Sequence, residues 1–215
     1  MFYAVLLWLH IGAGILTLLS AAGAMGTKIF TLPHSWHQIS GRFFYYAMVV
    51  VFVTSVVMTL LRPNLFLFLI AVFSFYLTFI GWRTAINRSG IAGLQERAAV
   101  IIMAVTGIGM IGTGTYFLIQ QDDQGITLLV FGGIGLMLSV SQMVRHHHRV
   151  TGKSRISSHI GHMSGATIAA VTAFLVTNIQ TDPEWIAWIA PTIVLTPVSF
   201  WLIGKRSRKV KGSKV

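Results

Sequence analysis

Histidine is the residue type whose chemistry and spacing in this sequence first suggest a functional site. Two histidines three residues apart, His159 and His162, stand at the start of an apolar run, and a second such pair, His34 and His37, precedes another. Residues three apart share one face of a helix, and neutral imidazole is a ligand for zinc, copper and haem iron. A metal or haem site is therefore one of three alternatives, beside pH sensing and the anchoring of helix ends among lipid headgroups.

The other four histidines have different surroundings. His10 lies within an apolar run, on one helical face with Gly14, Thr17 and Ala21, so we expect it to face other helices rather than lipid. It is either functional, as ionisable groups inside membrane segments commonly are, or a neutral ring that is hydrogen-bonded to a Ser or Thr of another helix. The triplet at 146–148 is typical of a solvated basic loop near anionic headgroups.

Composition identifies the solvent around these residues. Of the 215 residues, 54% are hydrophobic and only 10% are charged, whereas soluble domains carry about 25% charged residues. The net charge of +11 does not indicate nucleic-acid binding, because the basic residues lie between apolar runs. The absence of cysteine excludes disulfides, thiolate metal ligands and cysteine nucleophiles. The composition thus predicts an integral membrane protein.

Seven apolar runs approach the roughly 20 residues that a helix needs to cross a bilayer. They are residues 3–24, 43–61, 65–82, 98–119, 126–144, 159–179 and 185–203. Because the connections between them are short, we expect an all-α, polytopic membrane helix bundle of about seven transmembrane helices. It would form one transmembrane domain over residues 1–204, followed by a basic cytoplasmic tail over residues 205–215.

The distribution of charge orients these spans. Fifteen of the 16 Lys and Arg residues lie in alternate connections and the tail, and Arg62 alone lies on the other side. The positive-inside rule then predicts an external N-terminus and a cytoplasmic C-terminus. Both histidine pairs would lie at the cytoplasmic face, with His10 roughly 20 Å further out at 1.5 Å per residue. We therefore expect His10 to belong to a separate site. It could join the inner histidines only if its helix tilted or slid strongly, and this alternative stays open.

Two further patterns constrain the interior of the bundle. No Asp, Glu, Lys or Arg falls in the middle of a predicted span, which disfavours carboxylate ion coupling, a retinal lysine and voltage sensing. Small residues occur at helical spacing in two spans, Gly161 with Gly165, and Gly109 with Gly112. These two faces predict close helix packing.

Several stretches of the chain resemble a family of predicted bacterial membrane proteins known as domain of unknown function 2306. They are residues 10–14, 61–70, 73–76, 81–83, 163–178 and 188–192, together with Lys28, His37, Gly41 and Arg42. The resemblance covers nearly the whole chain and implies a multi-pass protein of the bacterial inner membrane, without an established activity. It implies that His10, His37 and His159 are the family's histidines, whereas His162 stands where the family pattern has arginine.

Two functions from different classes remain open. In the first, His37 and His159 ligate one haem b or divalent metal for electron transfer or metal handling, with His10, His34 and His162 as further candidate ligands. In the second, the chain is a cofactor-free small-solute transporter or an accessory subunit of a membrane complex. Whether it is an enzyme stays open, since histidine is the only catalytic base available in the spans. The expected partners are the bilayer and its anionic headgroups at the cytoplasmic face, with no nucleic acid; a homo-oligomer or a complex partner is also open.

Overall fold

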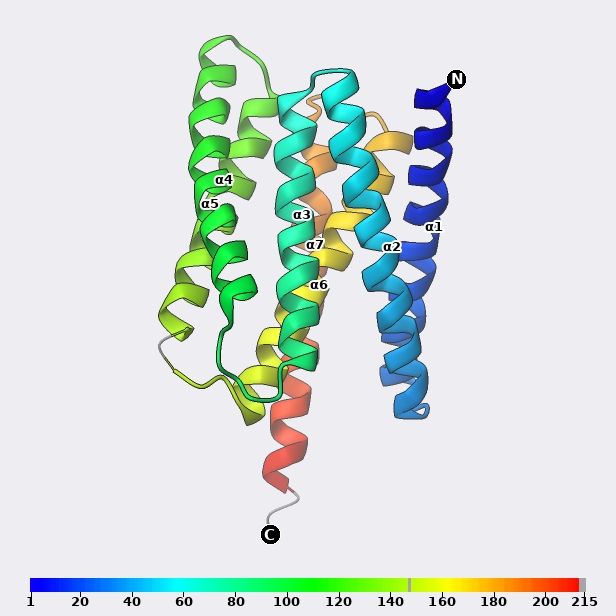
Figure 1. The fold of residues 1–215 in the computed structure, drawn as a ribbon, viewed down its shortest axis with the longest axis vertical. Coiled ribbons are helices and arrows are strands. Elements are labelled where there is room, and N and C mark those ends of the chain that lie inside the picture. Colours follow the sequence, from blue (N-terminus) through cyan, green and yellow to red (C-terminus); the bar gives the residue numbers. More distant parts are fainter. Residues whose placement is uncertain (147, 213–215) are drawn as a thin grey trace. The chain divides into compact units, whose positions relative to one another are not determined.

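Helices make up the part of the chain that the structure describes. The computed structural model describes residues 1–146 and 148–212, with side chains through residue 200 apart from position 147. Within these residues there is no strand, and there are seven helices: α1 (Phe2–Ile29), α2 (His34–Leu61), α3 (Leu65–Ile86), α4 (Leu94–Ile119), α5 (Gln124–Arg145), α6 (Gly152–Asn178) and α7 (Trp185–Gly212). The all-α prediction is confirmed for this part of the chain (Figure 1).

Six of the helices, α1 to α6, are long and apolar enough to cross a membrane. Their outward side chains are largely apolar, as lipid contact requires, with Leu9, Ile15 and Val105 among the exposed ones. The described apolar part of α7, Trp185–Phe200, falls short of the length that a span needs. The chain is thus a multi-pass helical membrane protein with six candidate spans. The seventh span and the side on which each terminus lies stay predictions.

The seven described helices all extend beyond the apolar runs that predicted them, and α2, α6 and α7 do so by the most residues. Helix α2 begins at His34, so the first histidine pair lies on this helix instead of before it, and α6 begins at Gly152, about two turns before the second pair. Pro33 is the N-cap residue of α2, with a φ of −52° and a ψ of 141°, a non-helical conformation that is usual for the residue just before a helix. Helix α7 continues to Gly212, through most of the predicted tail, whose residues 213–215 lie outside the described part. Hydropathy marks the segment inside hydrocarbon, whereas a helix continues wherever its backbone bonds can form.

The chain divides into two compact units, Met1–Phe75 and Tyr76–Val215. In the first unit α1 and α2 pack against each other as an antiparallel pair (Figure 1). At one end the Arg62 guanidinium lies 4.3 Å from the centroid of the Tyr3 ring. Toward the other end a Cβ built on Gly23 would lie 3.1 Å from Ser40 Oγ, so the two helices approach closely there. The prediction of one domain over residues 1–204 is not tested by this division and stays a prediction.

In the second unit α4 and α5 pack most closely at glycines. A Cβ on Gly107 would lie 3.1 Å from the Gly132 carbonyl oxygen, and one on Gly114 would lie 2.9 Å from the Gly125 carbonyl oxygen. The predicted packing face of this span was wrong, because a Cβ on Gly109 or Gly112 would meet nothing within 4 Å. Helix α4 carries small residues on two faces, and hydropathy does not indicate which face packs against another helix.

Helices α3 and α6 also approach each other within this unit. A Cβ on Gly81 would lie 2.7 Å from Met163 Sδ and 3.2 Å from the Met163 backbone nitrogen. One on Gly165 would lie 3.3 Å from Leu77, in agreement with the predicted packing role of Gly165, whereas Gly161 has open space. This contact holds the end of α6 that carries its histidines.

Candidate functional site

His10 on α1 is hydrogen-bonded to α2 inside the first unit. Its Nδ1 lies 3.0 Å from Thr54 Oγ1, and the Thr54 hydroxyl donates its own proton to the Val50 carbonyl at 2.7 Å. Because that hydroxyl proton is used, the Thr54 oxygen accepts, and His10 carries its proton on Nδ1. Thr17 and Ala21, on the same face of α1, are buried as predicted. The bond to a threonine of another helix is the structural role that the sequence offered for His10.

His37 lies on α2 near its start and is tied back to α1. Its Nδ1 donates to the Ala24 carbonyl at 3.1 Å and lies 3.5 Å from Thr27 Oγ1. Ala24 lies fourteen positions after His10 on α1, which corresponds to about 20 Å at helical rise. Within the first unit His10 and His37 therefore belong to different sites, as the sequence predicted.

His34 differs from the other helical histidines in its proton position. Lys28 Nζ lies 3.2 Å from His34 Nδ1, and an ammonium group has no acceptor, so this Nδ1 accepts and its lone pair is used. The ring is exposed and stacks on His37, with centroids 6.0 Å apart. His34 thus offers no preformed lone pair on Nε2, which weakens its candidacy as a metal ligand beside His37.

His159 and His162 lie on α6 in the second unit. His159 Nδ1 donates to the Gly81 carbonyl on α3 at 2.9 Å, and His162 Nδ1 donates to the Ser158 carbonyl at 2.8 Å. His162 is 6% exposed, and its Nε2 is buried without a hydrogen-bond partner. The hydroxyl of Tyr76 is also buried without a partner, and the two rings meet edge to face with centroids 6.2 Å apart.

Four histidines consequently share one tautomer. A carbonyl oxygen can only accept, so His37, His159 and His162 carry their proton on Nδ1, as His10 does. In a neutral ring this leaves the lone pair on Nε2. Histidines that bind metals in proteins are commonly held in this way, with the other ring N–H donated to a carbonyl or carboxylate. The arrangement prepares Nε2 to act as a ligand or a hydrogen-bond acceptor.

The described residues do not assemble a closed metal centre. Among them no group of three or more His, Cys, Asp or Glu side chains is placed to hold a metal ion. Of the histidine triplet, His146 and His148 are described and position 147 is not. A cofactor such as haem needs only one or two histidine ligands from the protein, whereas a structural zinc site needs four.

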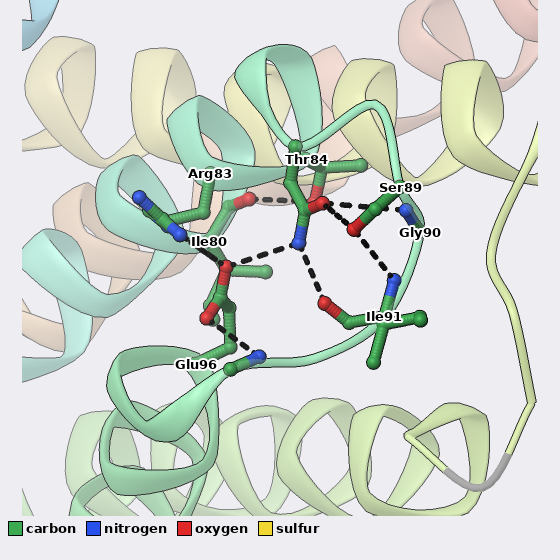
Figure 2. Close-up of polar contacts among 9 residues, drawn as sticks. Ile80, Arg83, Thr84, Ser89, Gly90, Ile91 and Glu96 are labelled. Atoms are coloured by element: carbon green, nitrogen blue, oxygen red, sulfur yellow. Dashed lines mark hydrogen bonds and ion pairs between the residues drawn. The ribbon is translucent and has the colours of Figure 1, made fainter.

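The sequence did not predict a polar cluster that lies in the second unit. Arg83 on α3 donates from Nε and Nη2 to Glu96 Oε1, each at 2.8 Å (Figure 2). Asn87 donates to the same oxygen at 3.3 Å, and the Gly93 backbone nitrogen donates to Glu96 Oε2 at 3.0 Å. Glu96 thus caps the start of α4 and joins it to the end of α3. The available signal was that Glu96 is the only acid on the side of the chain predicted to be basic.

The α3–α4 and α5–α6 connections meet beside this cluster. Val150 donates its backbone N–H to the Gly90 carbonyl at 2.9 Å, and Arg155 donates to the Ala85 carbonyl at 3.3 Å. Gly90 has a φ of +69°, and a Cβ there would lie 2.6 Å from the Val150 carbonyl oxygen, so only glycine fits. Both basic connections of this unit therefore lie at the same end of it, as the charge pattern predicted. No protein-family model, curated protein or solved structure matches the chain.

Proposed function

We propose that the chain is a seven-span protein of the bacterial inner membrane, related to the domain of unknown function 2306 family, with its N-terminus outside and its C-terminus in the cytoplasm. The six apolar helices and the one-sided distribution of Lys and Arg support this placement. The continuous helix α7, which carries the last apolar run into the basic segment, supports the seventh span.

Within this framework the proposed function is the binding of a haem iron or a divalent metal through histidine Nε2, for electron transfer or metal handling. The observation that carries it is the buried Nε2 of His162, which has a lone pair and no partner in the packed interior of the second unit. The large majority of buried polar side-chain atoms are paired, so an unpaired imidazole nitrogen supports the presence of a ligand. When bound, haem iron or copper would supply one-electron chemistry.

The chain's own residues would perform three tasks at this place. The carbonyl of Ser158 fixes the proton on His162 Nδ1 and orients the ring. The Gly81 carbonyl does the same for His159, one turn earlier on α6. The hydroxyl of Tyr76 supplies a second unpaired polar atom, able to donate to a group held by the histidine. In the first unit His37 has the same tautomer, and its ligation of one cofactor together with His159 stays a prediction.

The test is the absorption spectrum and metal content of the detergent-purified protein, after growth with haem precursor and metals supplied. We expect a Soret band or stoichiometric metal in the wild type, lost in His162→Ala and reduced in His159→Ala. His148→Ala is the matched control, because His148 is an exposed histidine of the α5–α6 connection, and it should retain the signal. A wild type with neither a Soret band nor metal would exclude the proposal and leave a cofactor-free transporter or accessory subunit.

A further inference from the structure

A small cavity lies in the second unit, where the α3–α4 and α5–α6 connections meet. Its volume is about 50 Å³, and its polar lining comes from four segments of the chain. The side chains that bear on its chemistry are Arg83, Glu96, Gln142, Arg145, Arg155 and Ser158. None of the histidines proposed above as ligands lines it.

The charge in this cavity is unbalanced. Three arginines and one glutamate line it. Both oxygens of Glu96 are already engaged, Oε1 by Arg83 and Asn87 and Oε2 by the Gly93 backbone. Glu96 therefore balances Arg83, and among the described lining residues no acid balances Arg145 or Arg155. An anion is the ligand class that this imbalance favours.

A buried hydroxyl in the lining points to a ligand independently of charge. Ser158 is 5% exposed, and its Oγ is buried without a hydrogen-bond partner. A buried serine hydroxyl nearly always has a partner, and it can donate to an anion oxygen. Ser158 lies one turn after Arg155 on α6, so the two belong to the same helical face.

The size of the cavity limits the anion. A water needs about 10–15 Å³ of such volume, so 50 Å³ accommodates about four water-sized groups. A tetrahedral oxyanion presents four oxygens, and the planar guanidinium fork matches two of them at once. We propose that this cavity binds a phosphate group, either as the free ion or on a lipid headgroup, between Arg145, Arg155 and the Ser158 hydroxyl. This site does not depend on the histidine cofactor.

The experiment measures binding in a phosphate-free maltoside detergent. The midpoint of thermal unfolding is followed against sodium phosphate or dihexanoyl phosphatidic acid, with sodium chloride at equal ionic strength and dihexanoyl glycerol as blanks. The wild type should show a saturable rise with at least one phosphate probe. Saturation by inorganic phosphate identifies the free ion, and saturation by the phosphatidic acid alone identifies a headgroup. A flat response to both probes would overturn the proposal.

Variants locate the binding. The double variant Arg145→Gln/Arg155→Gln should weaken the apparent affinity at least about tenfold, the loss expected from a charge-assisted hydrogen bond. Arg88→Gln/Arg97→Gln is the matched control, since it removes the same charge from exposed arginines outside this cavity and should bind as the wild type does. An equal loss in both double variants would mean diffuse attraction and would overturn the site.

Ser158→Ala separates binding from folding. Removing an unpaired buried hydroxyl should leave the ligand-free protein at least as stable, while the phosphate affinity falls severalfold. An unchanged affinity in this variant would overturn the placement of the phosphate against α6.

Discussion

The two histidine pairs, His34 with His37 on α2 and His159 with His162 on α6, have the same spacing and different surroundings. In the first pair one ring is exposed and accepts from Lys28, and the other is half-buried. In the second pair one ring bonds to a neighbouring helix and the other is buried with an unpaired Nε2. Equal spacing has produced a pair with one exposed ring in one unit and a pair with one buried ring in the other.

The difference shows what helical spacing can and cannot specify. Spacing by three places two side chains on one face, but the helix that covers this face decides their burial, their tautomer and their remaining lone pairs. Close contact between α3 and α6 at Gly81 brings a carbonyl within 2.9 Å of His159. No comparable cover reaches His34, which lies in the first turn of α2 and is exposed. Burial, and not spacing, distinguishes the stronger candidate.

The largest expected effect concerns the side of the membrane on which each histidine pair lies. The proposed orientation places both pairs on the cytoplasmic side. The chain has no cysteine, so single cysteines report cleanly on sidedness. Leu32→Cys, next to the first pair, and Lys153→Cys, next to the second, should react with an impermeant maleimide only after bacterial cells are permeabilised. Asp123→Cys, in the α4–α5 connection, should react in intact cells. Labelling of Leu32→Cys or Lys153→Cys in intact cells would contradict the proposed orientation.

The next largest difference is in stability. His162→Ala removes a buried ring and its bond to Ser158, and we expect a loss of about 2–3 kcal/mol in the free energy of unfolding. His34→Ala removes an exposed ring and should change it by less than about 0.5 kcal/mol. The measurement is reversible unfolding in mixed detergent, followed by circular dichroism.

A second substitution at each position tests whether packing explains the effect. His162→Gln retains most of the volume and a polar end, so it should recover part of the loss. Equal stability of His34→Ala and His162→Ala would show that the burial of His162 does not matter to the fold.

Much of the fold was predictable from hydropathy, because lipid imposes one requirement on every span. All seven apolar runs lie on helices, and the charge pattern correctly grouped the two connections that meet at Gly90 and Val150. The bond from His10 to a threonine was one of the two alternatives that the sequence left open, since a polar ring inside an apolar helix needs a partner. These features depend on one helix at a time or on the general rule that buried polar groups pair.

Features that depend on which helices meet were not predictable. The Arg83–Glu96 bond joins α3 to α4 across a loop, and neither residue has a motif that shows the other. The packing glycines of α4 are Gly107 and Gly114 instead of Gly109 and Gly112, because neighbouring positions differ only in the face they present. His162 is a stronger candidate ligand than His34 for the same kind of reason, because the neighbouring helices decide which of the two rings is buried.

The packing of α3 against the second histidine pair can be tested by substitution. Gly81→Leu should lower the free energy of unfolding by about 1–3 kcal/mol. The new side chain would meet the Met163 side chain and backbone, and such overpacking forces helices apart. Gly161→Leu is the matched control on α6, where a Cβ has open space, and should be within about 0.5 kcal/mol of the wild type. Thermal unfolding in detergent distinguishes them, and equal effects would remove α3 as the cover of this face.

The smallest effect that we expect comes from removing two hydroxyls, one beside each histidine pair. The two removals should change the free energy of unfolding in opposite directions. The Thr27 hydroxyl, near His37, is buried and donates to the Ala24 carbonyl at 2.8 Å, so Thr27→Val should destabilise the protein by about 1 kcal/mol. The Tyr76 hydroxyl, near His162, is buried without a partner. In cofactor-free protein Tyr76→Phe removes that uncompensated group and should be neutral or stabilising by up to about 1 kcal/mol.

The same tyrosine also tests the proposed ligand. If a group on His162 Nε2 accepts from the Tyr76 hydroxyl, Tyr76→Phe should lower its affinity by about tenfold, the net value of one good hydrogen bond. Tyr116→Phe, at an exposed tyrosine of α4, is the control and should change neither stability nor affinity. A cofactor-free Tyr76→Phe protein as destabilised as Thr27→Val would mean that this hydroxyl already has a partner. Tyr76 would then not be an unsatisfied donor for a ligand on His162, and the two histidine pairs would differ only in exposure and tautomer.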